Sequence, residues 1–318
     1  MNDLLLIGEA TDDMVNRLSQ RFKIHIFDEL PEPLTWLREN GQKIHYVATN
    51  GHDGVRSEHV DAMPNLKLIS CYGVGYVAID IKQAVARDII VTHTPNVLNA
   101  EVATTALLLL LACYRNLLGN DAYIREGKWE TEGNPAFTRS VDNQKIGILG
   151  LGRIGQAIVD KLSPFNPRIL YHSRHPKPVE YKYYADLTEM AEHSDALICI
   201  TPGGPETRKL VNADVINALG PKGTLINVSR GSVVDEQALI AALRTGRLGW
   251  AGLDVFENEP NVPQELKQLS NVVLLPHVGS APVETRAAMG RLTVDNLLSH
   301  DMHGRVISPV PECHGMLD

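Results

Sequence analysis

The chain has 318 residues, of which 44% are hydrophobic and 21% are charged, and its formal net charge is −8 at pH 7. This length exceeds what one ordinary hydrophobic core needs, so we expect two domains. The composition is typical of a folded globular protein and excludes a largely disordered chain. The acidic balance and the lack of a basic run argue against nucleic-acid binding, which rests on clustered positive charge.

Cysteine and histidine spacing predicts no metal site. The cysteines, Cys71, Cys113, Cys199 and Cys313, form no CxxC pair, and no two such residues stand at ligand spacing on one expected element. We therefore expect free buried thiols in a reducing compartment. The N-terminus lacks the basic start of a signal peptide, and the strongest apolar run, 106–113, is too short to span a bilayer. We expect a cytoplasmic location without membrane contact.

Short apolar segments alternate with amphipathic ones over the first hundred residues, which predicts a mostly parallel sheet. The expected helices are Asp12–Arg21 and Pro33–Asn40. A run rich in Ala and Leu, Ala100–Leu118, contains no Gly or Pro and predicts a long, mostly buried helix joining the two halves. The expected strands are Leu4–Ile7, Ile24–Ile26, Tyr46–Thr49, Leu68–Ser70 and Ile89–Thr92.

A second alternation follows the polar stretch 126–143 and predicts a second doubly wound unit. A final helix, Val283–Ser299, leads to a short tail with Pro309 and Pro311. The expected strands are Lys145–Leu149, Arg168–Tyr171, Ala196–Thr201, Thr224–Val228, Trp250–Val255 and Val272–Leu275. The helices expected between them are Ile154–Leu162, Asp186–Ala191, Asn212–Ala218 and Asp235–Thr245.

The segment Gly150–Gly155 carries the pattern GxGxxG between an expected strand and an expected helix. In that setting the first glycine allows a tight turn, the second lets backbone N–H groups approach a pyrophosphate, and the third lets helix pack on strand. The positive end of the helix dipole favours phosphate as well. A tight turn without a ligand is the simpler alternative, but the strand–helix context favours a dinucleotide site.

The end of the next strand indicates which dinucleotide binds. NAD sites place an Asp or Glu there, about 20 residues after the glycines, for the ribose 2′-OH. This chain has Ser173 and Arg174 instead, in the run Tyr171-His172-Ser173-Arg174-His175. Both can donate to a 2′-phosphate, Arg by a charge-assisted hydrogen bond. We therefore expect NADP(H) to be preferred and NAD(H) to remain possible; a solvated Arg174 is the alternative.

Polar residues follow four strands of the second unit, and the carboxyl ends of parallel strands meet at one edge of a sheet. Reduction of a keto acid needs a cation for the carboxylate and an acid for the developing alkoxide. Arg230 suits the first role, His277 the second, and Glu259 beside His277 would stabilise the imidazolium. Each of these three residues could instead have a purely structural role. The four strand ends read Thr201-Pro202, Ser229-Arg230-Gly231, Asp254 to Glu259, and Pro276 to Ser280.

These blocks, in this order, resemble the D-isomer-specific 2-hydroxyacid dehydrogenase family over nearly the whole chain. The blocks are Tyr72-Gly73-Val74-Gly75-Tyr76, Gly150–Gly155, Asn227 to Gly231, Gly252 to Pro260 and Pro276 to Ser280. The resemblance implies two Rossmann-like doubly wound α/β domains, with a cofactor domain (99–284) inserted into a flavodoxin-like substrate domain (1–98 and 285–318). It also implies an active site in the cleft and a homodimer formed around the long linking helix.

The resemblance also implies roles for single residues. Arg230, Glu259 and His277 match the catalytic set, the Val74 and Gly75 N–H groups hold the substrate carboxylate together with Arg230 and His277, and Asp254 touches the nicotinamide carboxamide. The expected cofactor contacts are Gly150, Gly152, Arg153, Ile154, Gly155, Ser173, Arg174, Thr201, Pro202, Val228, Ser229, Asp254 and Gly279.

Within the family, the Ser-Arg pair is most similar to NADPH-preferring glyoxylate/hydroxypyruvate reductases. The alternatives are a relative acting on phosphoglycerate, lactate or an aromatic or branched keto acid, and a dinucleotide-sensing corepressor. No cluster of Arg or Lys for a phosphorylated substrate surrounds the early glycine loop. Val77 stands where the family commonly has Asp, and Trp129 and Phe137 are candidates for an aromatic side chain that covers a partner subunit's substrate.

Overall fold

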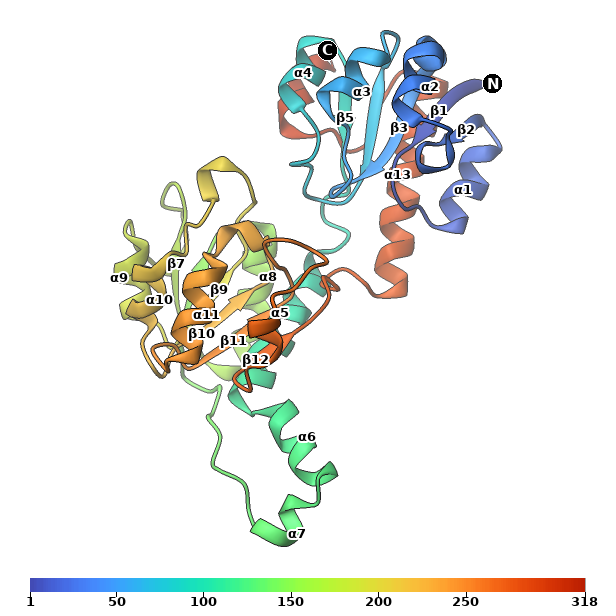
Figure 1. Cartoon of the computed structure of the whole chain (residues 1–318). Helices are drawn as coiled ribbons and strands as arrows, with labels where there is room; N and C mark the ends of the chain where they lie inside the picture. Colours follow the sequence, from blue (N-terminus) through green and yellow to red (C-terminus); the bar gives the residue numbers. More distant parts are fainter. Residues whose placement is uncertain (318) are drawn as a thin grey trace. The chain divides into compact units, whose positions relative to one another are not determined.

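The computed structural model describes residues 1–317 and divides into two compact units (Figure 1). Unit 1 contains Met1–Leu98 and the C-terminal part from Ala281, and unit 2 contains Asn99–Ser280. Each unit is an α/β fold around one parallel sheet, so the expected fold class is confirmed. The second division falls at 280/281 instead of at 285.

Unit 1 has a five-stranded sheet in the order β2-β1-β3-β4-β5, with all neighbouring strands parallel. This order is that of flavodoxin-like sheets. The strands are β1 (Asn2–Leu6), β2 (Phe22–Ile26), β3 (Ile44–Asn50), β4 (Leu68–Tyr72) and β5 (Ile90–Thr92). Four of them are longer or shifted by one or two residues relative to the expected strands, which is the ordinary uncertainty at element ends.

The helices of unit 1 are α1 (Asp12–Ser19), α2 (Pro33–Asn40), α3 (Ser57–Ala62), α4 (Ile81–Ala86) and α13 (Val283–His303). The sequence did not predict α3 and α4, because six residues are too few for a helical period to show. The C-terminal helix α13 packs on β4 and α1, and the buried Ser70 hydroxyl donates to the Thr293 carbonyl over 2.9 Å. This packing places the C-terminal part of the chain in unit 1.

Unit 2 has a seven-stranded parallel sheet in the order β12-β11-β10-β9-β6-β7-β8. Its glycine motif follows β6, which pairs with β7 on one side and β9 on the other, where the strand order of the sheet reverses. The strands are β6 (Lys145–Leu149), β7 (Arg168–His172), β8 (Lys182–Tyr183), β9 (Ala196–Cys199), β10 (Thr224–Asn227), β11 (Trp250–Leu253) and β12 (Val272–Leu274). The connecting helices are α8 (Arg153–Leu162), α9 (Leu187–Glu192), α10 (Ala213–Leu219), α11 (Glu236–Arg244) and α12 (Gln264–Lys267).

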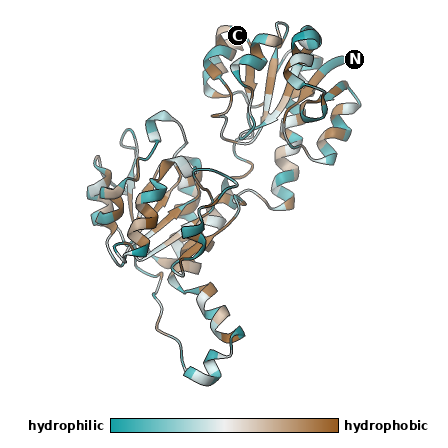
Figure 2. Ribbon diagram, in the orientation of Figure 1, coloured by the Kyte–Doolittle hydropathy of each residue, from teal (hydrophilic) through white to brown (hydrophobic). Residues whose placement is uncertain are grey.

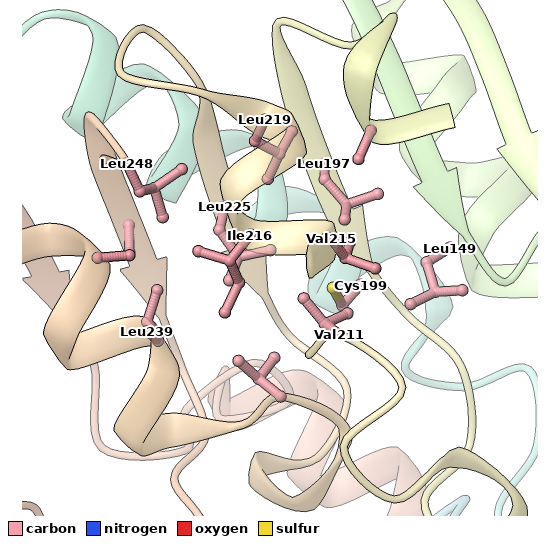
Figure 3. Packing of buried hydrophobic residues seen from close by; sticks show 14 of the residues in the cluster. Leu149, Leu197, Cys199, Val211, Val215, Ile216, Leu219, Leu225, Leu239 and Leu248 are labelled. Carbon is pink, nitrogen blue, oxygen red and sulfur yellow. The ribbon is translucent and has the colours of Figure 1, made fainter. Parts of the chain in front are cut away.

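The core of unit 2 forms where α10 and α11 cover the sheet. Leu197 and Leu225 on the strands and Ile216 and Leu239 on the helices are at most 1% exposed, and Figure 3 shows them side by side. Most strands of both units are brown in Figure 2 because hydrophobic side chains run along them with little alternation, as expected of parallel strands buried on both faces. The edge strand β2, with the sequence FKIHI, does alternate. This rigid base positions the loops at the strand ends.

The expected continuous helix Ala100–Leu118 is wrong at its C-terminal end. Helix α5 (Asn99–Tyr114) stops two residues before Asn116, which has left-handed backbone with φ of 46°, and α6 (Leu117–Arg125) starts afresh. A left-handed residue cannot continue an α-helix, and Asn tolerates this conformation better than most side chains. After α6 comes α7 (Lys128–Glu132), within a stretch predicted to be irregular. We call residues 116–140 the arm; its helices project away from the sheet of unit 2 (Figure 1).

Helix α5 packs against β10, β11 and α8, and half of its residues are buried, as expected. Among the described residues no single helix is long and apolar enough to cross a membrane. Within residues 1–317 only α5 and α6 taken together meet the requirement of length and composition, and they are bent by 56° at the break between them.

Candidate active site

The predicted site residues of unit 2 follow its parallel strands at their carboxyl ends. From one side of the sheet to the other, β12 leads to His277, β11 to Glu259, β10 to Arg230, β6 to the glycine turn and β7 to Ser173. Neighbouring strands lie about 4.8 Å apart. The edge can therefore hold an extended ligand with the glycine turn near its middle.

The glycine turn has the geometry that a dinucleotide needs. Gly150 has φ of +100°, and a Cβ there would meet the Thr201 N at 2.9 Å. A Cβ on Gly155 would lie 2.4 Å from the Gly150 carbonyl oxygen, so helix α8 can approach the turn only with glycine at this position. A Cβ on Gly152 would meet no atom within 4 Å, so the space beside this residue is open.

Helix α8 turns its N-terminal N–H groups toward this turn. The first helical bond runs from the Gln156 N–H to the Gly152 carbonyl over 2.9 Å, so the preceding N–H groups, including that of Ile154, stand before the helical bond pattern. The N–H groups in the first turn of a helix and the positive end of its dipole favour an anion. Together with the open side of Gly152, these residues fit a pyrophosphate.

The end of β7 carries the residues predicted to recognise the 2′-phosphate. The Ser173 hydroxyl donates to the His175 carbonyl over 2.6 Å, which shapes the turn after the strand. The Arg174 guanidinium lies 3.8 Å from the Glu206 carboxylate, and both side chains are more than four-fifths exposed. So exposed an ion pair contributes little free energy, which leaves Arg174 able to turn toward an anionic ligand.

The turn after β10 is organised by Asn227, a residue whose role the sequence did not reveal. Its side-chain oxygen accepts from the Ser229 N–H over 3.1 Å and from the Ser229 hydroxyl over 2.7 Å. Its amide nitrogen donates to the Arg230 carbonyl over 3.1 Å. A 1% exposed Asn227 thus fixes the backbone of Val228, Ser229 and Arg230 from beneath.

Two glycines let the loops around Arg230 come together. A Cβ on Gly203, in the loop that follows Thr201 and Pro202, would lie 2.9 Å from the Arg230 Cγ. A Cβ on Gly231 would overlap the Phe256 carbonyl group at 1.9 Å. The structure therefore brings the ends of β9, β10 and β11 into direct contact, as their adjacency in the sheet predicts.

His277 and Glu259 form a hydrogen-bonded pair, with 2.7 Å between Nδ1 of His277 and Oε2 of Glu259. The other carboxylate oxygen of Glu259 accepts from the Phe256 N–H over 2.9 Å. Burial by itself would raise the pKa of Glu259, but these hydrogen bonds and the positive charge of Arg230 and His277 outweigh it and hold the pKa below its usual value. Glu259 is therefore ionised at neutral pH.

Asp254 holds the loop that carries His277. Its carboxylate accepts from the Val278 N–H over 2.7 Å and from the Gly279 N–H over 2.8 Å, and its carbonyl accepts from the His277 N–H over 2.8 Å. His277 has left-handed backbone with φ of 53°, a conformation that costs free energy in a residue other than glycine and persists only where neighbours impose it. Burial raises the pKa of Asp254 above its usual value despite the two N–H bonds.

Glu236 is a second residue whose role the sequence did not reveal. Its carboxylate is largely buried and accepts from the Glu257 N–H over 3.2 Å. Burial raises the pKa of Glu236 above its usual value. Because Glu236 begins α11, it ties the loop between Phe256 and Glu259 to the body of the unit. A single acidic residue at a helix start carries no sequence signal for this contact.

In unit 1 the loop Gly73–Tyr76 follows β4, as expected, at the carboxyl edge of that sheet. Within the described residues the Val74 and Gly75 N–H groups have no hydrogen-bond acceptor. Adjacent N–H groups of this kind suit a carboxylate. Val77, where Asp was expected from the resemblance, is 60% exposed. Trp129 and Phe137 lie in the arm with exposed side chains, apart from the strand ends of unit 2.

The contacts of Asp254 predict a measurable change in the His277 loop. Asp254→Asn replaces one accepting oxygen by a nitrogen that cannot accept, so one of the two N–H groups of Val278 and Gly279 loses its partner. We expect hydrogen exchange in a peptide spanning 275–281 to become at least about tenfold faster, since one hydrogen bond to a charged group contributes about 1.5–3 kcal/mol. Mass spectrometry measures this. Glu180→Gln, at an exposed position in unit 2, is the control, and unchanged exchange in Asp254→Asn would contradict the assignment.

Comparison with known proteins agrees with this geometry. Residues 107–279 match the model of the D-isomer specific 2-hydroxyacid dehydrogenase NAD binding domain. The chain is 43% identical over 308 residues to a glyoxylate/hydroxypyruvate reductase A of Arabidopsis thaliana and, over the same length, 43% identical to a hydroxyphenylpyruvate reductase of Plectranthus scutellarioides. Each alignment covers 96% of this chain and 98% of the relative.

A solved structure is similar over both units. It is the NADPH-dependent glyoxylate/hydroxypyruvate reductase of Sinorhizobium meliloti in complex with NADP and malonate, with a TM-score of 0.90, 42% identity and 98% of both chains covered. The glycine turn, the strand-end residues and the full-length similarity to these relatives lead to one conclusion: the chain belongs to the D-isomer-specific 2-hydroxyacid dehydrogenase family.

Proposed function

We propose that the protein reduces a small 2-keto acid, glyoxylate, hydroxypyruvate or a close relative, to the D-2-hydroxy acid with NADPH. The observation that carries the proposal is the His277–Glu259 pair, which follows strands of the same sheet as Arg230 and the glycine turn. Relatives named for glyoxylate and hydroxypyruvate reduction support the choice of substrate. Unit 1 then acts as the substrate domain and unit 2 as the cofactor domain.

We assign the binding of the substrate carboxylate to Arg230, Val74 and Gly75. From unit 2, the Arg230 guanidinium offers two parallel N–H donors, which match the two oxygens of a carboxylate. The Val74 and Gly75 N–H groups of unit 1 donate to the same carboxylate. These contacts orient the carbonyl group of the keto acid before any proton moves.

His277 supplies the proton. Because its Nδ1 is occupied by Glu259, Nε2 is the nitrogen that can donate to the carbonyl oxygen. The ionised Glu259 stabilises the protonated imidazole and holds its orientation. When bound, NADPH supplies the hydride to the carbonyl carbon. With the proton from His277 on the oxygen, the carbonyl becomes the hydroxyl group of the D-2-hydroxy acid.

The cofactor is held along the strand ends of unit 2. Backbone groups of Gly152, Arg153 and Ile154 bind the pyrophosphate at the start of α8. Ser173 and Arg174 bind the 2′-phosphate. Toward the nicotinamide end we place Thr201, Pro202, Val228, Ser229, Asp254 and Gly279. Because the Asp254 carboxylate already accepts from Val278 and Gly279, its part includes holding the His277 loop.

An aromatic keto acid is the second candidate substrate, since a relative of equal identity is named hydroxyphenylpyruvate reductase. Initial rates with NADPH against glyoxylate, hydroxypyruvate, pyruvate and 4-hydroxyphenylpyruvate decide between the candidates. We expect kcat/KM to be highest for glyoxylate or hydroxypyruvate. A protein that turns over none of the four acids would contradict the proposal and favour a dinucleotide-sensing role.

The His277–Glu259 pair makes a specific prediction for this reaction. His277→Ala should lower kcat about 10²–10⁴-fold, the range that general acids contribute. Glu259→Gln removes the charge that favours the protonated imidazole, so the alkaline decline of kcat/KM should move to lower pH. Glu257→Gln makes the same change in the same loop without a contact to His277 and should leave the pH profile in place. Equal profiles for both glutamine variants would show that Glu259 has no such role.

The Ser173–Arg174 pair predicts the cofactor preference. Arg174→Ala removes a charge-assisted donor to the 2′-phosphate, so KM for NADPH should rise about tenfold while KM for NADH stays the same. Arg168→Ala serves as the matched control, because Arg168 is exposed at the opposite end of the same strand. A wild-type protein that uses NADH as efficiently as NADPH would disprove the preference.

We further propose a homodimer formed through the arm. Apolar side chains clustered on a surface favour contact with another protein. Four such side chains in the arm are each more than half exposed, those of Leu117, Leu118, Ile124 and Trp129. Phe137, the other candidate for covering a partner's substrate, is fully exposed in the arm as well.

We also propose a cytoplasmic location, since the four buried thiols suit a reducing compartment.

The exposed apolar side chains of the arm predict a dimer in solution that a charged substitution in the arm dissociates. Wild-type protein should have twice the monomer mass in light scattering after size exclusion. Ile124→Asp should shift the population toward monomer, because a charge would be buried in the contact. Val179→Asp, at an apolar position in unit 2 outside the arm that is 36% exposed, should remain dimeric. A monomeric wild type would refute the dimer.

A further inference from the structure

The carbonyl groups of Gly73 and Val74 set the direction in which the Val74 and Gly75 N–H groups point. In a trans peptide the carbonyl and the following N–H point in opposite directions within one plane. The Val74 N–H therefore shares a plane with the Gly73 carbonyl, and the Gly75 N–H shares one with the Val74 carbonyl. A contact that fixes either carbonyl therefore also fixes the direction of the N–H group in the same peptide.

Two consecutive residues after β5 hold both carbonyls. The Thr94 N–H donates to the Gly73 carbonyl over 2.8 Å. The His93 ring, through Nδ1, lies 3.1 Å from the Val74 carbonyl oxygen. A carbonyl can only accept, so Nδ1 of His93 carries the proton in this contact. The bond also polarises the peptide and so strengthens the Gly75 N–H as a donor.

His93 is itself fixed by the C-terminal segment. Its N–H donates to the Ser308 carbonyl over 3.1 Å, and its carbonyl accepts from the Ser308 hydroxyl over 2.7 Å. Asn296 of α13 accepts from the Ser308 N–H over 3.0 Å. Both backbone groups of His93 are therefore held by Ser308, which lies 215 positions later in the chain.

The ring of His93 is braced as well. The Tyr76 ring stands edge-on to it, with centroids 5.5 Å apart and planes at 85°. The Tyr76 hydroxyl donates to the Glu312 carboxylate over 3.0 Å, and burial together with this bond raises the pKa of Tyr76, so the donor proton is retained. With 7% of His93 exposed, the imidazole has little room to turn away from Val74.

We propose that His93 is a positioning residue for substrate binding: its imidazole, braced by Ser308 and Tyr76, holds the Val74 carbonyl so that the Gly75 N–H points at the substrate carboxylate. The inference rests on the proposed function in one respect, that Val74 and Gly75 bind the carboxylate. It adds that the C-terminal segment, through Ser308 and Glu312, belongs to the substrate-binding apparatus of unit 1.

The test compares two substitutions of His93. His93→Phe keeps a flat ring against Tyr76 but removes the donor, whereas His93→Asn keeps a short donor. For His93→Phe we expect KM for the keto acid to rise about tenfold, the effect of one hydrogen bond, with kcat within about threefold of wild type and KM for NADPH unchanged. His93→Asn should recover most of the loss. A role in stability alone would lower the melting temperature without this split between KM and kcat.

The matched control is His193→Phe in unit 2. The Nδ1 of His193 also lies against a backbone carbonyl, that of Glu189, over 2.8 Å, so the same bond is lost away from the loop. Its kinetic constants should stay at the wild-type values. Tyr76→Phe, which removes only the bond to Glu312, should raise KM for the keto acid about two- to threefold and serves if His93→Phe does not fold.

Binding of oxalate, a non-reacting dicarboxylate, separates this inference from the proposed reaction. Calorimetry should show oxalate bound by the wild type and a dissociation constant about tenfold higher in His93→Phe. This result would support the positioning role even if the keto acids tested were not turned over. Equal oxalate affinity in wild type and His93→Phe, or no oxalate binding by the wild type, would overturn it.

Discussion

The site in unit 2 depends on one constraint, the parallel direction of its strands. Every strand ends at the same edge, so residues far apart in the chain, such as Arg230 after β10 and His277 after β12, come to lie along one edge of the sheet. The hydrophobic core beneath, with α10 and α11 packed on the sheet (Figure 3), keeps that edge rigid. Polar groups on loops are precise only when such a base holds them.

Above that base, buried polar side chains fix the functional loops. Asn227 bonds the turn of Arg230, Glu236 bonds the loop that leads to Glu259, and Asp254 bonds the loop of His277. In unit 1, His93 plays the same part for the loop of Val74. In each case a side chain satisfies backbone groups that a loop leaves without partners, which is the usual requirement for ordered irregular backbone near a ligand. The loops proposed to touch ligand therefore depend on these buried side chains for their position.

The sequence predicted much of the fold and of the site because the patterns that indicate them lie within short stretches of the chain. The apolar runs predicted the central strands, and the glycine spacing with a strand before it and a helix after it predicted the turn at Gly150. The break at Asn116 was not predicted, since Ala100–Leu118 itself contains no Gly or Pro and a left-handed Asn leaves no periodic signal. The short helices α3, α4 and α7 were missed for want of length.

The sequence by itself determined the family, the two α/β units and the residue types at the strand ends, because these depend on composition, periodicity and short motifs. Only the tertiary structure decided which groups hold those residues in place. Ser308 reaches His93 across 215 positions, and Gly279 reaches Asp254 across 25. Such contacts form when distant segments pack together, and a buried Asn, Asp or His looks the same in the sequence whether it binds a loop, a ligand or water.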